Sequence, residues 1–183
     1  MQEILDKWGI KVDYNLLLTM WNESQRSYHT QNHLLDLIDQ INEYKNNLTQ
    51  KEYDKLILCA LFHDIVYDPK KQNNEEMSAD FFINSCTDKN NPDILEVKQM
   101  ILDTKNHIAN TPLSEIFNSF DMKIVERDYD KLLEWEQGIY NEFASYGDLY
   151  KKGRIAFLEK MLDKYPHNTH NLLKLIDYVK SNY

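Results

Sequence analysis

The sequence predicts an all-α protein of roughly nine helices, and three observations support this fold class. Apolar residues recur at three- and four-residue intervals along most of the chain, which is typical of amphipathic helices. Capping residues stand just before these runs. Only four glycines and four prolines occur in 183 residues, far fewer than a turn-rich sheet protein needs. We therefore expect long helices and no strand.

These signals place the helices from the first to the last. The first three expected helices cover 13–21, about 30–44 and 49 to about 67. The next four begin at Asn73 or Asn74, at Asn91, at Thr111 and at Asp128. The last two cover 149–165 and about 168–180. Thr49 and Glu52 form a capping box, and the helix that they open is apolar all round, so we expect it at the centre of the fold. Asn91 and Thr111 are each followed by a proline, which suits the first position of a helix. Gly147 ends the seventh expected helix.

The chain is expected to form one domain. Residues 1–183 contain no internal repeat, low-complexity segment or linker that would divide them. The candidate site residues described below fall within about 26–124, and the C-terminal helices follow over 128–183. We therefore predict a core that carries the site, extended by C-terminal helices.

Composition and charge exclude several classes of partner. The net charge is −9 with no Lys/Arg-rich stripe, so long nucleic acid is a poor partner. No apolar segment approaches the roughly 20 residues needed to cross a bilayer, and the first residues lack the apolar stretch of a signal peptide, so we expect no membrane partner. Cys59 and Cys86 stand far apart without metal or redox spacing, which favours a reduced, cytoplasmic setting. A small anionic substrate is compatible with this charge if a metal supplies a positive field.

The adjacent pair His63 and Asp64 is the most informative feature of the chain. It follows the apolar run 56–62, where burying an imidazole and a carboxylate costs free energy unless they bind a metal or pair. We expect the pair in the last turn of its helix, because a proline follows shortly. About thirty residues earlier, His29 and His33 are four positions apart and share one helical face if both are helical. Together these residues predict a metal site.

The metal and its remaining ligand are constrained by chemistry. Imidazole with carboxylate suits Mn, Fe, Co, Ni or Zn, and we expect a divalent ion of this kind or Mg, with one or two ions bound. A further ligand must come from downstream. Asp121 is the candidate, because its carboxylate follows the apolar residues Ile116, Phe117 and Phe120. A carboxylate in apolar surroundings needs a compensating partner.

This pattern resembles the HD superfamily of metal-dependent phosphohydrolases, in which His … His-Asp … Asp lies on an all-helical bundle. The resemblance covers about 26–124 and rests on the helix order, the gap between the two motifs and the His-Asp pair after an apolar run. Residues 26–29, 62–68 and 74–79 are similar to a bacterial branch of predicted HD phosphohydrolases, whose substrates are largely unassigned. The resemblance implies an HD-domain helical bundle.

The resemblance also implies a ligand set. His33, His63, Asp64 and Asp121 would bind the metal. Asp103 is the rival of Asp121, because the spacing to the last aspartate varies among HD proteins.

Three further residues receive catalytic roles, His29 and Asp68 by resemblance and Glu75 because it opens the next helix. Tyr28 to His33 is similar to the motif of cyclic-nucleotide phosphodiesterases, which makes His29 a general acid, although Thr30 stands where that family has asparagine. Asp68 lies where the guanosine-tetraphosphate hydrolases of the superfamily place an acid near the attacking water. Glu75 is a candidate for holding a metal-bound water or a second metal. Two of the three also have a structural interpretation, Asp68 as a stop signal before a proline and Glu75 as a charge favoured by the helix dipole.

The predicted function is metal-dependent hydrolysis of a phosphate ester, in a nucleotide or another small phosphorylated metabolite. Arg26 and His107 are candidates for contact with the substrate phosphate, and His107 is expected at the end of a helix. One alternative is an HD-type di-iron oxygenase, which would need His107 and Glu75 as further ligands. Another is a non-catalytic nucleotide-binding regulatory module. The apolar stripe over 135–143 forms core or a self-association face, so a homo-oligomer is compatible with the sequence.

Overall fold

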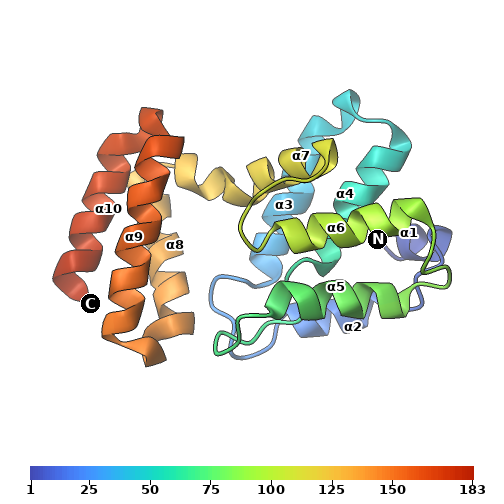
Figure 1. The fold of residues 1–183 in the computed structure, drawn as a ribbon, viewed down its shortest axis with the longest axis horizontal. Helices are drawn as coiled ribbons and strands as arrows, with labels where there is room; N and C mark the ends of the chain where they lie inside the picture. Colours follow the sequence, from blue (N-terminus) through green and yellow to red (C-terminus); the bar gives the residue numbers. More distant parts are fainter. The chain divides into compact units, whose positions relative to one another are not determined.

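The computed structural model describes every residue from Met1 to Tyr183, and its elements are helices, which confirms the all-α prediction (Figure 1). The α-helices are α1 (Gln2–Lys7), α2 (Tyr14–Trp21), α3 (Gln31–Tyr44), α4 (Gln50–Phe62), α5 (Asn74–Ser85), α6 (Pro92–Asp103), α7 (Pro112–Asp121), α8 (Tyr129–Phe143), α9 (Asp148–Lys164) and α10 (Thr169–Asn182). Short 3-10 helices are η1 (Lys45–Asn47), η2 (Met122–Glu126), η3 (Ala144–Tyr146) and η4 (Pro166–Asn168). A single bridge pairs Ile10 with Cys86, and no strand forms.

Several start signals in the sequence act as predicted, whereas Asn73 precedes α5 without a side-chain cap bond. Thr49 and Glu52 form both bonds of the capping box at α4. The side chain of Asn91 accepts a hydrogen bond at the start of α6, and that of Asp128 does so at α8. Gly147 takes a positive φ of 51° between η3 and α9, a conformation that glycine adopts without steric cost.

One predicted boundary is wrong, one helix was not predicted, and α3 begins as expected directly after Thr30. α4 ends at Phe62 rather than near residue 67, and the segment after it is held by side chains of α5. α3 begins at Gln31 because Thr30 caps it, so His29 lies outside the helix. α1 has only six residues, too few to show helical periodicity in a sequence.

The chain forms two compact units, Met1–Asp121 (unit 1) and Met122–Tyr183 (unit 2). The division lies shortly before the predicted end of the site-bearing core, 26–124, and precedes the predicted C-terminal helices, 128–183. Each unit is described below by itself, and the expectation of one domain over 1–183 stays a prediction.

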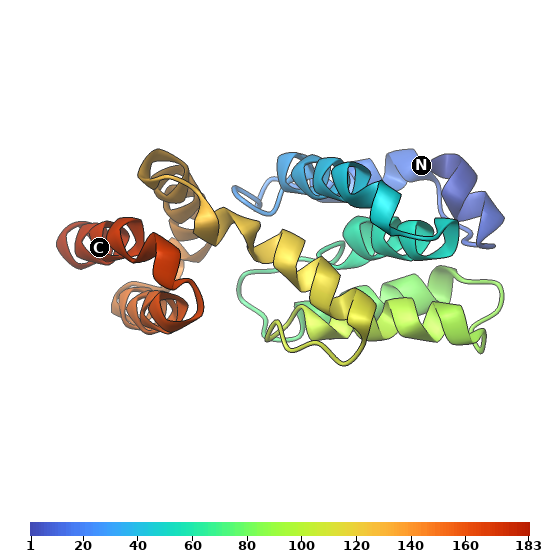
Figure 2. The ribbon, with the colours of Figure 1, turned by 90° about the horizontal axis from the view of Figure 1, so that it is seen from above.

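Unit 1 is built around α4. Every residue from Asp54 to Phe62 is buried, as expected for a helix that is apolar all round. Helices α3, α5, α6 and α7 pack against α4, and Figure 2 shows α4 between α3 on one side and α5 with α6 on the other. The C-terminal end of α4 carries His63 and Asp64, so the core fixes the position of this pair.

Unit 2 consists of α8, α9 and α10, which pack against one another. Its core encloses a polar group, because the carboxylate of Glu136 is fully buried. Tyr150 donates its hydroxyl to one carboxylate oxygen at 2.5 Å, and Arg154 Nε donates to the other at 2.5 Å. The Arg154 guanidinium also lies 4.0 Å from the ring centre of Trp135. No helix of either unit is both long and apolar enough to cross a membrane.

Candidate metal centre

His33 enters the site from the first turn of α3. The Thr30 cap sets where this helix begins, and the apolar face with Leu34, Leu37 and Ile41 buries it against the core. These contacts place the His33 side chain, only 5% exposed, over the end of α4. Its Nε2 lies 3.4 Å from the Nε2 of His63.

His63 and Asp64 occupy the turn that follows α4. The Nδ1 of His63 lies 3.1 Å from the carbonyl oxygen of Ala60, which is one turn earlier. Donation from Nδ1 to this carbonyl leaves Nε2 free to bind a metal, an arrangement common among metal-binding histidines. The Nε2 of His63 is 3.2 Å from Asp64 Oδ2. The two adjacent residues thus direct one nitrogen and one oxygen to the same point.

Asp121, the last residue of α7, completes the group. Its Oδ1 lies 3.1 Å from Nε2 of His33 and 3.8 Å from Nε2 of His63. The rival Asp103 points elsewhere, because its carboxylate accepts hydrogen bonds from Gln99 and from the backbone and side chain of Asn110. The structure therefore brings Asp121, and not Asp103, to the two histidines.

The separations between these atoms fit a single small cation. Two ligand atoms about 2.1 Å from one ion are about 3.0 Å apart on an octahedral edge and about 3.4 Å apart in a tetrahedron. The contacts His33–Asp121, His63–Asp64 and His33–His63 measure 3.1, 3.2 and 3.4 Å. The ligand atoms of His33, His63 and Asp64 all lie within 4.8 Å of one another. Two imidazoles and two carboxylates also form a borderline ligand set of the kind predicted.

The charges of the group favour a bound cation. Burial raises the pKa of Asp64 and of Asp121, but neighbouring histidines outweigh this effect and hold both values below the usual range of a carboxyl. Burial lowers the pKa of His63, whereas Asp64 and Asp121 raise it, and the result is a pKa of about 9. The shifts favour two charged, partly buried carboxylates beside a protonated imidazole. A divalent metal can replace that proton.

His29 lies at the edge of the group rather than on a shared helical face with His33, so that expectation is corrected. It precedes the cap of α3, and its ring stacks on Tyr67 with the centroids 4.6 Å apart. Its Nε2 is 3.9 Å from Asp64 Oδ2. The side chain is 21% exposed, compared with 1% for His63, so solvent and small molecules can reach it.

His107 contacts the free oxygen of Asp121. The prediction that it ends a helix is wrong, because α6 ends at Asp103 and His107 follows in a turn with a positive φ of 51°. Such a conformation is costly for a residue with a side chain and persists only where its surroundings impose it. The Nε2 of His107 lies 3.0 Å from Asp121 Oδ2. His107 therefore holds the carboxylate whose other oxygen faces the histidine pair.

Glu75 and Asp68 differ in how close they come to the group. Burial raises the pKa of Glu75, and the charge of Asp64 raises it further, so these two carboxylates are near enough to interact. The side chain of Asp68 is 41% exposed, and its carboxylate accepts a hydrogen bond from the backbone N–H of Lys70 and lies 3.7 Å from Lys71 Nζ. The contacts of Asp68 fit a turn-stabilising residue, whereas the charge of Asp64 influences Glu75.

Arg26 is not placed to bind a substrate phosphate, and this prediction is corrected. Its side chain has no exposed surface. Its guanidinium donates hydrogen bonds to the backbone carbonyls of His29 and Ile65 at 2.9 and 3.1 Å. The sequence suggested a charged residue at the surface, but Trp21 and Tyr67 enclose it.

Sequence reasoning missed the residues that support the site. Trp21 is fully buried and packs its ring against His63 and His33, with centroids 5.5 and 6.4 Å apart. From α5, Ser78 bonds both the N–H and the carbonyl of Val66. Asn74 does the same for Asp68. The motif 74–79 was noted in the sequence, but only the folded chain shows that it holds the segment after the His-Asp pair.

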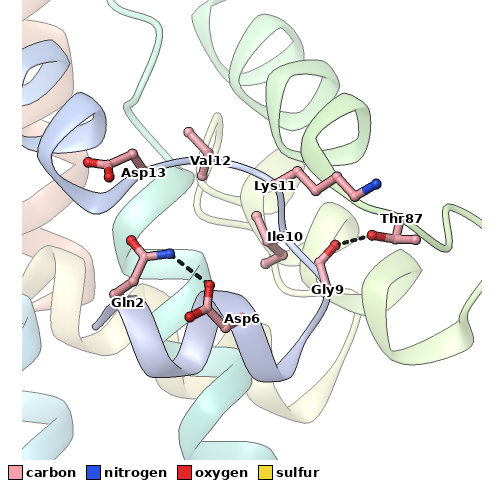
Figure 3. Close-up of a pocket in the computed structure, with 8 residues that line it drawn as sticks. All are labelled: Gln2, Asp6, Gly9, Ile10, Lys11, Val12, Asp13 and Thr87. Atoms are coloured by element: carbon pink, nitrogen blue, oxygen red, sulfur yellow. Dashed lines mark hydrogen bonds between the residues drawn. The ribbon is translucent and has the colours of Figure 1, made fainter.

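A separate surface pocket lies between α1 and the turn after α5 (Figure 3). Polar groups that line it form hydrogen bonds with one another: Gln2 donates to Asp6, and Thr87 donates to the carbonyl of Gly9. Asp13 caps α2. The pocket contains none of the predicted site residues, and hydrogen bonds of the local structure involve Gln2, Asp6, Asp13 and Thr87.

Comparison of the chain with protein-family models, with curated proteins and with solved structures finds no match in any of the three. The functional interpretation therefore depends on the residues and geometry described above.

Proposed function

We propose that the protein is a metal-dependent hydrolase of small phosphate esters, as the resemblance to the HD superfamily implies. The observation that carries the proposal is the cluster of His33, His63 and Asp64, whose ligand atoms lie within 4.8 Å of one another, with the Asp121 carboxylate 3.1 Å from His33. These residues would hold a divalent ion. Such an ion polarises phosphoryl oxygens and lowers the pKa of bound water toward neutrality.

The residues around this group have roles in proton transfer. His29, partly exposed beside Asp64, donates a proton to the leaving oxygen of the ester. Glu75 is the better candidate for accepting a proton from the attacking water, because its raised pKa makes it a stronger base than an ordinary carboxylate. Asp68, exposed in its turn, is the weaker candidate. The substrate would be a nucleotide or another small phosphorylated metabolite.

A second candidate function is oxygenation at a di-iron centre. It is favoured by one observation, the contact of His107 with the second oxygen of Asp121. A carboxylate held from both oxygens can bridge two ions, and Glu75 lies near enough to Asp64 to contribute. Two bound iron ions per chain with the absorption spectrum of an oxo- or hydroxo-bridged pair, and no phosphate release, would favour this function over hydrolysis.

The test is a metal analysis of protein purified without chelator, followed by a phosphate-release screen across nucleotides and sugar phosphates with each divalent metal. His33→Ala should lose the metal. His29→Ala should keep it and lose turnover by roughly 10²–10⁴-fold, the usual contribution of a general acid. His170→Ala, at an exposed histidine of unit 2, is the matched control and should change neither.

Two outcomes would contradict the proposal. Absence of phosphate release from every ester with every metal would reject hydrolysis, and saturable nucleotide binding without turnover would indicate a regulatory module. If His29→Ala empties the site while His33→Ala leaves the metal bound, the roles of the two histidines are reversed.

A further inference from the structure

Arg26 connects the two segments that carry the candidate site. It lies between α2 and α3, with its side chain fully enclosed. Nη1 donates to the carbonyl of His29, in the segment before α3, and Nη2 donates to the carbonyl of Ile65, in the turn after α4. These segments are 36 residues apart in sequence, from His29 to Ile65. One planar side chain therefore fixes the distance between them.

The faces of the same guanidinium contact rings that support the site histidines. The Cζ of Arg26 lies 5.2 Å from the ring centre of Trp21 and 5.1 Å from that of Tyr67. Trp21 packs against His63, and Tyr67 stacks on His29 with an angle of 32° between the rings. Arg26 thus acts on His29 twice, through its carbonyl and through the ring beneath it.

We propose that Arg26 is a positioning residue that holds the His29 side chain at the Asp64 carboxylate. This inference rests on the proposed function, in which His29 is the general acid. Proton donation requires a fixed geometry, and displacement by about 1 Å can cost roughly 10²-fold in rate. His29 lies outside the helix and therefore lacks the backbone restraint that α3 gives to His33. The contacts of Arg26 supply a restraint of this kind.

The chemistry of this position selects arginine over lysine. An ammonium group cannot donate to two carbonyls from a rigid plane while that plane lies against two aromatic rings. Arg26→Lys keeps the charge and most of the volume but loses this geometry. Arg154 offers a matched control, because it is also a buried arginine over a tryptophan ring but pairs with Glu136 in unit 2.

The experiment compares two substrates in metal-loaded protein, an alkyl phosphate ester with a poor leaving group and nitrophenyl phosphate with a good one. Arg26→Lys should keep the metal stoichiometry and lower kcat on the alkyl ester by roughly 10–10²-fold, with KM nearly constant. On nitrophenyl phosphate the loss should stay within about threefold, because a stable leaving anion needs little protonation. In the double variant, Arg26→Lys should lower kcat on the alkyl ester by less than about threefold relative to His29→Ala alone.

Arg154→Lys should lower thermal stability without any dependence on the leaving group. An equal loss on both substrates in Arg26→Lys, or losses that multiply with those of His29→Ala, would overturn the proposal and leave Arg26 with a role in folding alone.

A second readout separates this inference from the proposed function. If the wild-type protein hydrolyses neither ester, the hydrolase proposal fails, and amide hydrogen exchange then decides the role of Arg26. Arg26→Lys should speed exchange in both 27–30 and 63–67 and leave α10 unchanged. Faster exchange in only one of these segments, or in neither, would show that Arg26 does not hold them together.

Discussion

Both units bury charged side chains, but only in unit 2 does a permanent positive charge pair with the buried carboxylate. In unit 2 the carboxylate of Glu136 receives hydrogen bonds from Arg154, which is permanently charged, and from Tyr150. In unit 1 the carboxylates of Asp64 and Asp121 face imidazoles, which are cationic only when they hold a proton. Burial of an unpaired charge is costly, so an added cation would stabilise the group in unit 1.

The comparison indicates how a structural ion pair can be told from a functional one. The pair in unit 2 needs nothing from outside, and its arginine lies flat on Trp135 as a packed core residue. The group in unit 1 combines four ligand atoms and partly exposed neighbours, His29 and His107, which a small molecule can reach. Accessibility together with incomplete charge balance is what points to function.

The largest effect in this comparison is expected in unit 2. Arg154→Met removes the cation and leaves Glu136 buried without a charged partner, which should cost about 3–5 kcal/mol of the free energy of unfolding. Chemical denaturation followed by circular dichroism measures this loss. Metal content per folded chain should stay at the wild-type value. A loss below about 1 kcal/mol would mean that Glu136 is not charged in the core.

The pH dependence of stability should differ between the metal-free and the metal-loaded protein. The raised pKa of His63, about 9, contributes stability that is fully present below about pH 6.5 and is lost as the pH rises toward 9. The size of this loss is on the order of 3 kcal/mol. The lowered pKa values of Asp64 and Asp121 contribute stability that is lost as the pH falls below about 4.

Metal-free protein should therefore melt at a lower temperature at pH 9 than at pH 6. The melting temperature of metal-loaded protein should fall less between these pH values, because the ion replaces the proton on the imidazole. Melting curves with and without chelator measure both. Equal losses in the two forms would contradict the assignment of His63 as a ligand.

The smallest effect concerns His107. His107→Ala removes the contact that holds Asp121 and should weaken metal binding by about 10–100-fold without abolishing it, as is typical of residues that orient ligands. Replacement also relieves little strain, because alanine meets the same cost at a positive φ. Metal titration by calorimetry tests this, with His167→Ala in unit 2 as the control. Complete loss of binding would indicate that His107 is itself a ligand.

The sequence predicts the helices of this protein well because their caps are local signals. Thr49 with Glu52 and Asp128 act within one helical turn of their own positions. The end of α4 could not be predicted, because residues 66–68 are bonded by α5, which follows later in the chain. Local patterns do not contain such contacts.

The candidate ligands also show that local sequence patterns do not contain contacts between distant residues. His63 and Asp64 stand out because they follow an apolar run, whereas Asp121 and Asp103 both lie at the ends of partly apolar helices and only the fold separates them. Arg26 was predicted to contact phosphate or to be a solvated charge, and both interpretations require an accessible side chain. Its burial depends on Tyr67, which is distant in sequence.

The central claim is that unit 1 binds a metal at His33, His63, Asp64 and Asp121, and elemental analysis tests it most directly. Wild-type protein purified without chelator should carry at least one divalent ion per chain, and His63→Ala and Asp64→Ala should each carry none while remaining helical by circular dichroism. Glu136→Gln, which alters the buried carboxylate of unit 2, should retain the wild-type metal content. Full metal content in both the His63→Ala and Asp64→Ala variants would contradict the claim.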